Sequence, residues 1–162
     1  MAATLSRPRS GEQHEGMSDA DEYDLSRFLT AQDSGGSYDT ALAELHSGSK
    51  RSHWIWFIFP QISGLGRSPT AIRYGISGSD EARAYLAHPV LGPRLLACLD
   101  ALRTLASSDP IAVLGGIDAM KLRSSITLFL HAAEDERVRG RFQAVLDQYF
   151  GGQEDPQTLA RL

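Results

Sequence analysis

The segment LGPRLLACLDALRTL (residues 91–105) decides the fold class of this chain. Its leucines recur at spacings of three and four, and this spacing places side chains on one face of an α-helix. The segment therefore predicts a long helix whose apolar face is formed by Leu91, Leu95, Leu99, Leu102 and Leu105.

Helical spacing also covers most of the chain on either side of this segment. Ser68-Pro69 and Asp155-Pro156 each provide a capping side chain followed by proline at the first helical position. Gly48 and Gly151 follow the ends of two apolar patterns, where helices often terminate. The predicted helices run from Leu25 to Gln32, from Ser37 or Asp39 to Leu45, from Pro69 to Tyr74, from Ser79 to His88, from Asp118 to Leu130, from Val138 to Phe150 and from Pro156 to Leu162, with a short turn after Asp109 that Gly115-Gly116 ends.

Strand signals are almost absent from the sequence. Residues 55–58 alone have strand-like composition, and one short strand cannot form a sheet. The sequence therefore predicts an all-α fold, a compact single-domain bundle of about six to eight helices. An irregular Trp-rich segment is expected between helices 2 and 3.

Composition limits the class of protein. The 162 residues, 42% of them hydrophobic and 22% charged, suit one globular domain, predicted over residues 21–162. Residues 1–20 are small, polar and turn-prone, and we expect a disordered tail there. The net charge of −4 argues against a broad nucleic-acid surface. No apolar run reaches membrane-spanning length, and the single cysteine, Cys98, favours a cytoplasmic protein.

The Trp-rich stretch KRSHWIWFIFPQISGLGRS (residues 50–68) is the leading candidate for a functional surface. Lys50 and His53 could hold an anion while a neighbouring ring stacks on a base or sugar. The rings could instead be core anchors, and the glycines at 64 and 66 could form a plain turn. A glycine turn before a helix that begins after Ser68 could also present backbone N–H groups to an anion.

A second set of polar residues lies on the predicted helix that Asp118 caps. Lys121 and Ser125 share one face of that helix, and a serine and lysine together can support nucleophilic chemistry. Capping by Asp118 and hydroxyl bonds within the helix are the structural alternative. No catalytic residue is identified, and His53 and Asp118 are the weak candidates. Neither a metal site nor a cofactor is predicted, because ligand spacings are missing.

Several blocks of this sequence resemble one bacterial family. They include HWIWFIFPQ (residues 53–61) with GLGRS (64–68), AYLAHPVLGPRL (84–95), DAMKLRSSITLF (118–129) and DPQTL (155–159). In this order they resemble the family catalogued as domain of unknown function 1810, over about residues 23–162. The resemblance implies a compact helical fold, a cytosolic bacterial protein and no established activity. The label calpastatin, sometimes attached to such proteins, does not suit this ordinary globular pattern, and Gly75 stands where the family pattern favours alanine.

Two functions from different classes follow from these residues. The first is a pocket for a small anionic ligand, such as a nucleotide or an ADP-ribose-like compound, with hydrolysis as the reaction class should the protein be an enzyme. The second is a non-catalytic module that binds a partner protein or a second copy through the aromatic segment. Neither nucleic acid nor a membrane is an expected partner, and the oligomeric state stays open. The predicted ligand-binding residues are Lys50, His53, Trp54, Trp56, Gln61, Gly64, Gly66, Ser68, Tyr74, Lys121 and Ser125.

Overall fold

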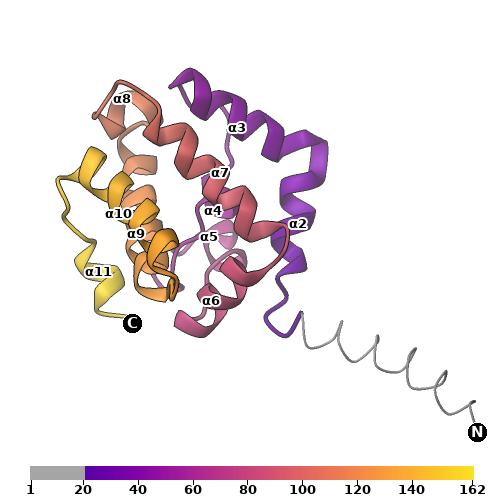
Figure 1. Cartoon of the computed structure of the whole chain (residues 1–162). Helices are drawn as coiled ribbons and strands as arrows, with labels where there is room; N and C mark the ends of the chain where they lie inside the picture. Colours follow the sequence, from indigo (N-terminus) through magenta and orange to yellow (C-terminus); the bar gives the residue numbers. More distant parts are fainter. Residues whose placement is uncertain (1–20) are drawn as a thin grey trace, which may run out of the picture.

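The fold is built from six longer helices that pack around a common core (Figure 1). The computed structural model describes residues 21–162, so the predicted tail at residues 1–20 lies outside the described part. The all-helical prediction is confirmed, and within residues 21–162 six helices have eight or more residues. They are α2 (Ser26–Asp33), α3 (Ser37–Ser47), α6 (Ser79–Ala87), α7 (Leu91–Arg103), α9 (Gly116–Ala132) and α10 (Glu136–Phe150).

Short helices lie between the longer ones or follow the last of them. They are the 3-10 turn η1 (Ser34–Gly36), α4 (Ile55–Ile58), α5 (Pro69–Arg73), α8 (Pro110–Leu114) and α11 (Pro156–Leu159). The three that begin with proline are each capped by the side chain before it: Ser68, Asp109 and Asp155 accept hydrogen bonds from backbone N–H groups of the first turn. A capping side chain followed by proline favours the start of a helix, because the side chain accepts the free N–H groups and proline already has the helical φ angle.

Helix α9 occupies the centre of the fold. It packs against α6, α8, α10 and α11, and ten of its side chains are buried. A chain of aromatic rings crosses the core beside it, with centroids 5.1 Å apart for Phe28 and Tyr85, 5.3 Å for Tyr85 and Phe129, and 5.9 Å for Phe129 and Phe142. These four rings join α2, α6, α9 and α10 into one apolar interior.

Helix α7 crosses the front of the molecule in Figure 1 and buries the leucine face that its sequence predicts. Leu91, Leu95, Leu99 and Leu102 are buried. Gly92 lets the start of α7 approach the end of α6, because a Cβ atom there would lie 2.2 Å from the carbonyl oxygen of Leu86. The close approach of the two helices at this turn therefore requires a residue without a side chain.

The Trp-rich segment differs from the prediction of an irregular connection. Residues Ile55–Ile58 form one helical turn. Such a turn places Ile55 and Ile58 on the same side, and both side chains are buried there. The chain then extends, and an isolated parallel bridge pairs Ile62 with Ile76. The bridge ties the two ends of the loop that carries α5, and no strand is formed within residues 21–162. No helix in this described part is long and apolar enough to cross a membrane.

Candidate functional site

Glu44 on α3 anchors the beginning of the Trp-rich segment. Its carboxylate accepts hydrogen bonds from the backbone N–H groups of Arg51 and Ser52, at 2.9 and 3.0 Å, and from the Ser52 hydroxyl at 2.6 Å. It also accepts a hydrogen bond from the indole N–H of Trp54, at 2.9 Å. Burial raises the pKa of Glu44, but these hydrogen bonds outweigh it and lower the pKa to about 2. The carboxylate thus holds the segment before α4 in one conformation.

Asp118 in the first turn of α9 connects the two lysines of the chain. Its carboxylate lies 2.7 Å from Lys50 Nζ and 3.7 Å from Lys121 Nζ. The sequence predicts that Asp118 caps this helix, and this prediction is wrong. The helix begins at Gly116 after Gly115 with no side-chain cap, and the carboxylate of Asp118 faces the lysines instead.

The surroundings of these charges form a cleft of about 370 Å³, called here the lysine cleft. Lys121 Nζ lies 5.1 Å from the ring centroid of the half-buried Trp56, a cation–π distance. His53 is exposed on the wall of the cleft. The lining residues are Lys50, His53, Trp56, Leu114, Gly115, Gly116, Ile117, Asp118 and Lys121.

A second hollow of about 260 Å³ continues from the lysine cleft and is called here the apolar groove. Ile117 and Lys121 line both hollows, so the two are contiguous along α9. Ile117 and Met120 on its rim are 72% and 71% exposed, which is unusual for side chains of this size. The groove is lined by Gln61, Leu65, Gly66, Ala71, Ile117, Met120, Lys121, Ser124, Asp155 and Gln157.

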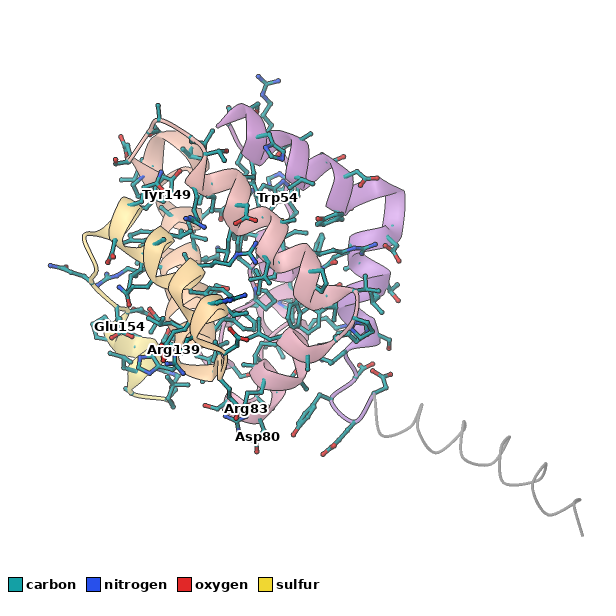
Figure 2. The ribbon with its side chains drawn as sticks, in the orientation of Figure 1. Trp54, Asp80, Arg83, Arg139, Tyr149 and Glu154 are labelled. Carbon is teal, nitrogen blue, oxygen red and sulfur yellow. The ribbon has the colours of Figure 1, made fainter. Side chains whose placement is uncertain are left out.

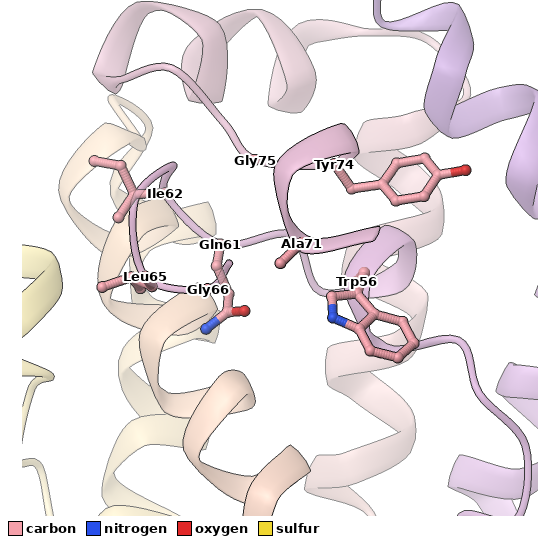
Figure 3. Close-up of a pocket in the computed structure, with 8 residues that line it drawn as sticks. All are labelled: Trp56, Gln61, Ile62, Leu65, Gly66, Ala71, Tyr74 and Gly75. Carbon is pink, nitrogen blue, oxygen red and sulfur yellow. The ribbon is translucent and has the colours of Figure 1, made fainter. Parts of the chain in front are cut away.

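A small recess lies between Trp56 and the glycine loop (Figure 3). The amide of Gln61 extends between Gly66 and Trp56, so it can meet a group bound in the recess or in the apolar groove. The ring of Tyr74 points away from Gln61 and lies 5.8 Å from Phe28 and 5.6 Å from Phe57, measured between centroids. Tyr74 therefore lines the recess while its ring belongs to an aromatic cluster.

The structure brings together six of the eleven predicted ligand-binding residues around the two hollows. Lys50, His53 and Trp56 come from the Trp-rich segment, Gln61 and Gly66 from the loop after it, and Lys121 from α9. These elements are far apart in sequence, and the packing of α4 against α9 brings them together.

The other five predicted residues lie outside the two hollows: Tyr74 lines the small recess, and the remaining four lie elsewhere. Trp54 is 1% exposed and its ring packs in the core, 6.4 Å from Phe59 between centroids (Figure 2). Ser125 is also 1% exposed and its hydroxyl is buried without a hydrogen-bond partner in residues 21–162. The Ser68 hydroxyl accepts the Ala71 N–H as a helix cap, and Gly64 (φ +99°) lies beside the side chain of Arg161.

Comparison with known proteins identifies the family. The model described as "Protein of unknown function (DUF1810)" matches residues 22–162. The chain belongs to the DUF1810 family. It is also similar to the conserved hypothetical protein Rv1873 from Mycobacterium tuberculosis, whose crystal structure was determined at 1.38 Å. The two are 45% identical with a TM-score of 0.82, and the match covers 88% of this chain and 98% of Rv1873. No curated protein matches this chain significantly.

The sequence resemblance leads us to expect alanine at position 75, and the structure gives a reason for glycine there. A Cβ atom at Gly75 would lie 2.5 Å from the Ser63 hydroxyl oxygen and 3.1 Å from the Ser63 Cα. The Ser63 N–H donates a hydrogen bond to the carbonyl oxygen of Ile76, and this bond beside the bridge between Ile62 and Ile76 holds Ser63 close to Gly75. Glycine therefore accommodates Ser63 at this contact.

Sequence reasoning missed several residues that line the hollows of this DUF1810 protein. Gly115, Gly116, Ile117, Met120 and Asp155 were not candidates, although all five line the cleft or the groove. A compositional signal could have indicated the site: the chain contains two lysines against fourteen arginines, and both lysines line the lysine cleft. Within residues 21–162 no group of three or more metal-ligating side chains is close enough to hold a metal ion.

Proposed function

We propose that this DUF1810 protein binds a small organic anion, such as a nucleotide or an ADP-ribose-like compound, in the lysine cleft and the apolar groove. The observation that carries the proposal is the convergence of Lys50, His53, Trp56 and Lys121 on one concave surface. Cations, an aromatic ring and hydrogen-bonding groups around a hollow are the usual composition of a ligand site.

The charge of the cleft favours an anion. Two lysines face one aspartate, which leaves one net positive charge before any contribution from His53. The 17-residue helix α9 also begins at the cleft, and its first backbone N–H groups have no capping side chain. Uncapped N–H groups and the helix dipole both favour negative charge at this position.

The apolar groove suits the remainder of the ligand. Leu65, Ala71, Ile117 and Met120 supply apolar walls for a base or another planar group. The Gln61 amide can form hydrogen bonds with polar atoms on the edge of such a group. If the bound ligand is hydrolysed, His53 is the freer acid or base, because Asp118 already pairs with both lysines.

A ligand screen with matched variants tests this proposal. The protein is heated with nucleotides, sugar phosphates and ADP-ribose, and the unfolding temperature is recorded. Lys121→Gln should abolish the stabilisation by an active ligand, whereas Arg103→Gln should preserve it. Arg103 is a suitable control because it is exposed and, among residues 21–162, its ion pair is with Asp100 of its own helix at 3.7 Å. Absence of stabilisation across the panel would contradict the proposal.

His53 and His46 offer a second matched pair. Both are exposed, but His46 lies in the last turn of α3 and does not line the lysine cleft. His53→Ala should weaken binding of the stabilising ligand, and His46→Ala should leave its affinity unchanged. Equal effects of the two substitutions would remove His53 from the site.

Self-association is the second candidate function, and the exposure of Ile117 and Met120 favours it. Trp54 is buried and so cannot act as the exposed anchor that this alternative requires. Two large apolar side chains more than 70% exposed on adjacent turns of α9 could instead meet a second copy. Light scattering measures the mass in solution, and Met120→Glu should convert a dimer to a monomer. A wild-type monomer at high concentration would exclude this function.

We also infer a bacterial cytoplasmic location, which the state of Cys98 supports. Burial raises the pKa of this thiol to about 12, so it stays protonated inside the core. A protonated, buried thiol is a poor nucleophile and forms no disulfide.

A further inference from the structure

Both lysines of this chain lie at one place in the structure. Fourteen of its sixteen basic residues are arginines, and the two lysines both lie within 4 Å of the Asp118 carboxylate. Arginine and lysine differ in chemistry: the guanidinium keeps its proton, whereas a lysine amine can lose one and act as a nucleophile. The cleft therefore holds every side-chain amine of the protein.

The two lysines have different environments. Lys50 is 6% exposed in its side chain, donates to the carbonyl oxygen of Ser52, and lies 4.8 Å above the ring of the buried Trp54. Its position between a carboxylate, a carbonyl and a ring is that of a fixed structural cation. Lys50 thus compensates the charge of Asp118.

Lys121 is the accessible amine. Its side chain is 23% exposed, and its Nζ atom lies 3.7 Å from Asp118, beyond hydrogen-bond distance. It lines both the lysine cleft and the apolar groove, so a molecule in either hollow meets its amine. Trp56 beneath it restricts the positions that the side chain can adopt.

We propose that Lys121 forms an imine with a carbonyl-bearing anion; this inference rests on the proposed function. Asp118 accepts a proton from the Lys121 ammonium, and the neutral amine attacks the carbonyl carbon. The attacking nitrogen passes one of its protons to the carbonyl oxygen, and the resulting hydroxyl leaves as water with the proton that Asp118 returns. The C=O bond is replaced by a protonated C=N bond, and one water molecule is released.

The geometry defines the class of substrate. His53 and the net positive charge of the cleft accommodate a phosphate or carboxylate on the same molecule as the carbonyl group. The apolar groove on the other side of Lys121 accepts its uncharged part. An aldehyde or ketone attached to a phosphate or carboxylate meets both requirements.

Reductive trapping tests this inference with little ambiguity, because the chain has three amines: Lys50, Lys121 and the N-terminus. The full-length protein is incubated with glyceraldehyde 3-phosphate and sodium cyanoborohydride, and peptide mass spectrometry locates the adduct. Lys121 should react at least about tenfold faster than Lys50, and this preference should vanish in the urea-unfolded chain. Lys121→Arg keeps the charge and should lose the adduct.

Glycerol 3-phosphate, which has no carbonyl group, separates this inference from the proposed function. We expect it to bind the wild type and Lys121→Arg with similar affinity, since both retain the positive charge. Binding of glycerol 3-phosphate without a glyceraldehyde 3-phosphate adduct overturns the imine and leaves the anion site standing. Adducts spread equally over all three amines also overturn it, and failure of both compounds to bind or react counts against both proposals.

Discussion

Replacement of Glu44 by glutamine should destabilise the protein at neutral pH and should do so less as the pH falls. The carboxylate accepts four hydrogen bonds, and glutamine keeps an oxygen for the three that Oε1 receives, including the one from Trp54. The substitution thus removes the charge while it preserves most of the geometry. Its effect measures how strongly a negative charge is stabilised at this position.

The magnitude follows from the pKa of Glu44, which falls from 4.5 to about 2. A shift of this size corresponds to about 3.4 kcal/mol, and partial exposure of the carboxylate to water reduces the expectation to about 2 kcal/mol. Because the pKa is lower in the folded state, this stability is present above about pH 5 and is lost as the pH falls towards 2. The difference between wild type and Glu44→Gln should therefore decline to less than about half of its neutral value by pH 3.

Urea unfolding followed by tryptophan fluorescence and circular dichroism at pH 7, 5, 4 and 3 measures this difference. Glu136→Gln serves as the control, because the Glu136 side chain is 88% exposed and its loss should change stability by less than about 0.5 kcal/mol. Glu44→Ala should cost about 1 kcal/mol more than Glu44→Gln, since it leaves the Trp54 N–H without an acceptor. A difference between wild type and Glu44→Gln that stays constant from pH 7 to pH 3 would refute the reasoning.

Three further substitutions test other contacts. Gly92→Ala should cost about 3 kcal/mol or more in urea unfolding, because its Cβ would collide with a backbone carbonyl oxygen 2.2 Å away. Asp155→Ala should cost about 1–2 kcal/mol through loss of the α11 cap. Burial raises the pKa of Asp155, but hydrogen bonds from two neighbouring hydroxyls outweigh it and lower the pKa, so this cost should diminish below about pH 4. The neutral His88 ring accepts hydrogen bonds from the N–H groups of Val90 and Leu91 at Nδ1, and burial lowers the pKa of this ring. The destabilisation by His88→Ala should therefore be largest above about pH 6.5 and should decrease as the pH falls. Pulse proteolysis over the same pH range checks the last two.

The helices were predictable because their signals are local. Leu91, Leu95, Leu99 and Leu102 form the buried face of α7 as expected, whereas Leu105 lies beyond the end of the helix at Arg103 and is only half-buried. The cap-then-proline pairs at Ser68 and Asp155 begin α5 and α11 as expected. Each of these features depends on residues within one or two turns of each other. The single turn of α4 was not predicted, because four strand-like residues carry no helical signal and only their burial favours a helical turn.

The candidate site was predictable in part. The sequence indicated the Trp-rich segment but could not distinguish Trp54 from Trp56, which are two residues apart and differ in burial. Glu44 makes the difference, since its carboxylate holds the Trp54 indole in the core. Nothing in the sequence around Glu44 indicates this contact, because its partners lie seven to ten residues further along the chain.

The sequence by itself determined that this chain is helical, where most of its helices begin and end, and which family it resembles. Only the tertiary structure decided that Lys50 and Lys121 share the Asp118 carboxylate and that Trp56 faces the same cleft. The physical reason is the range of the interactions. Helix periodicity and capping act within a few residues, whereas a cleft depends on how α4 and α9 pack around the buried core.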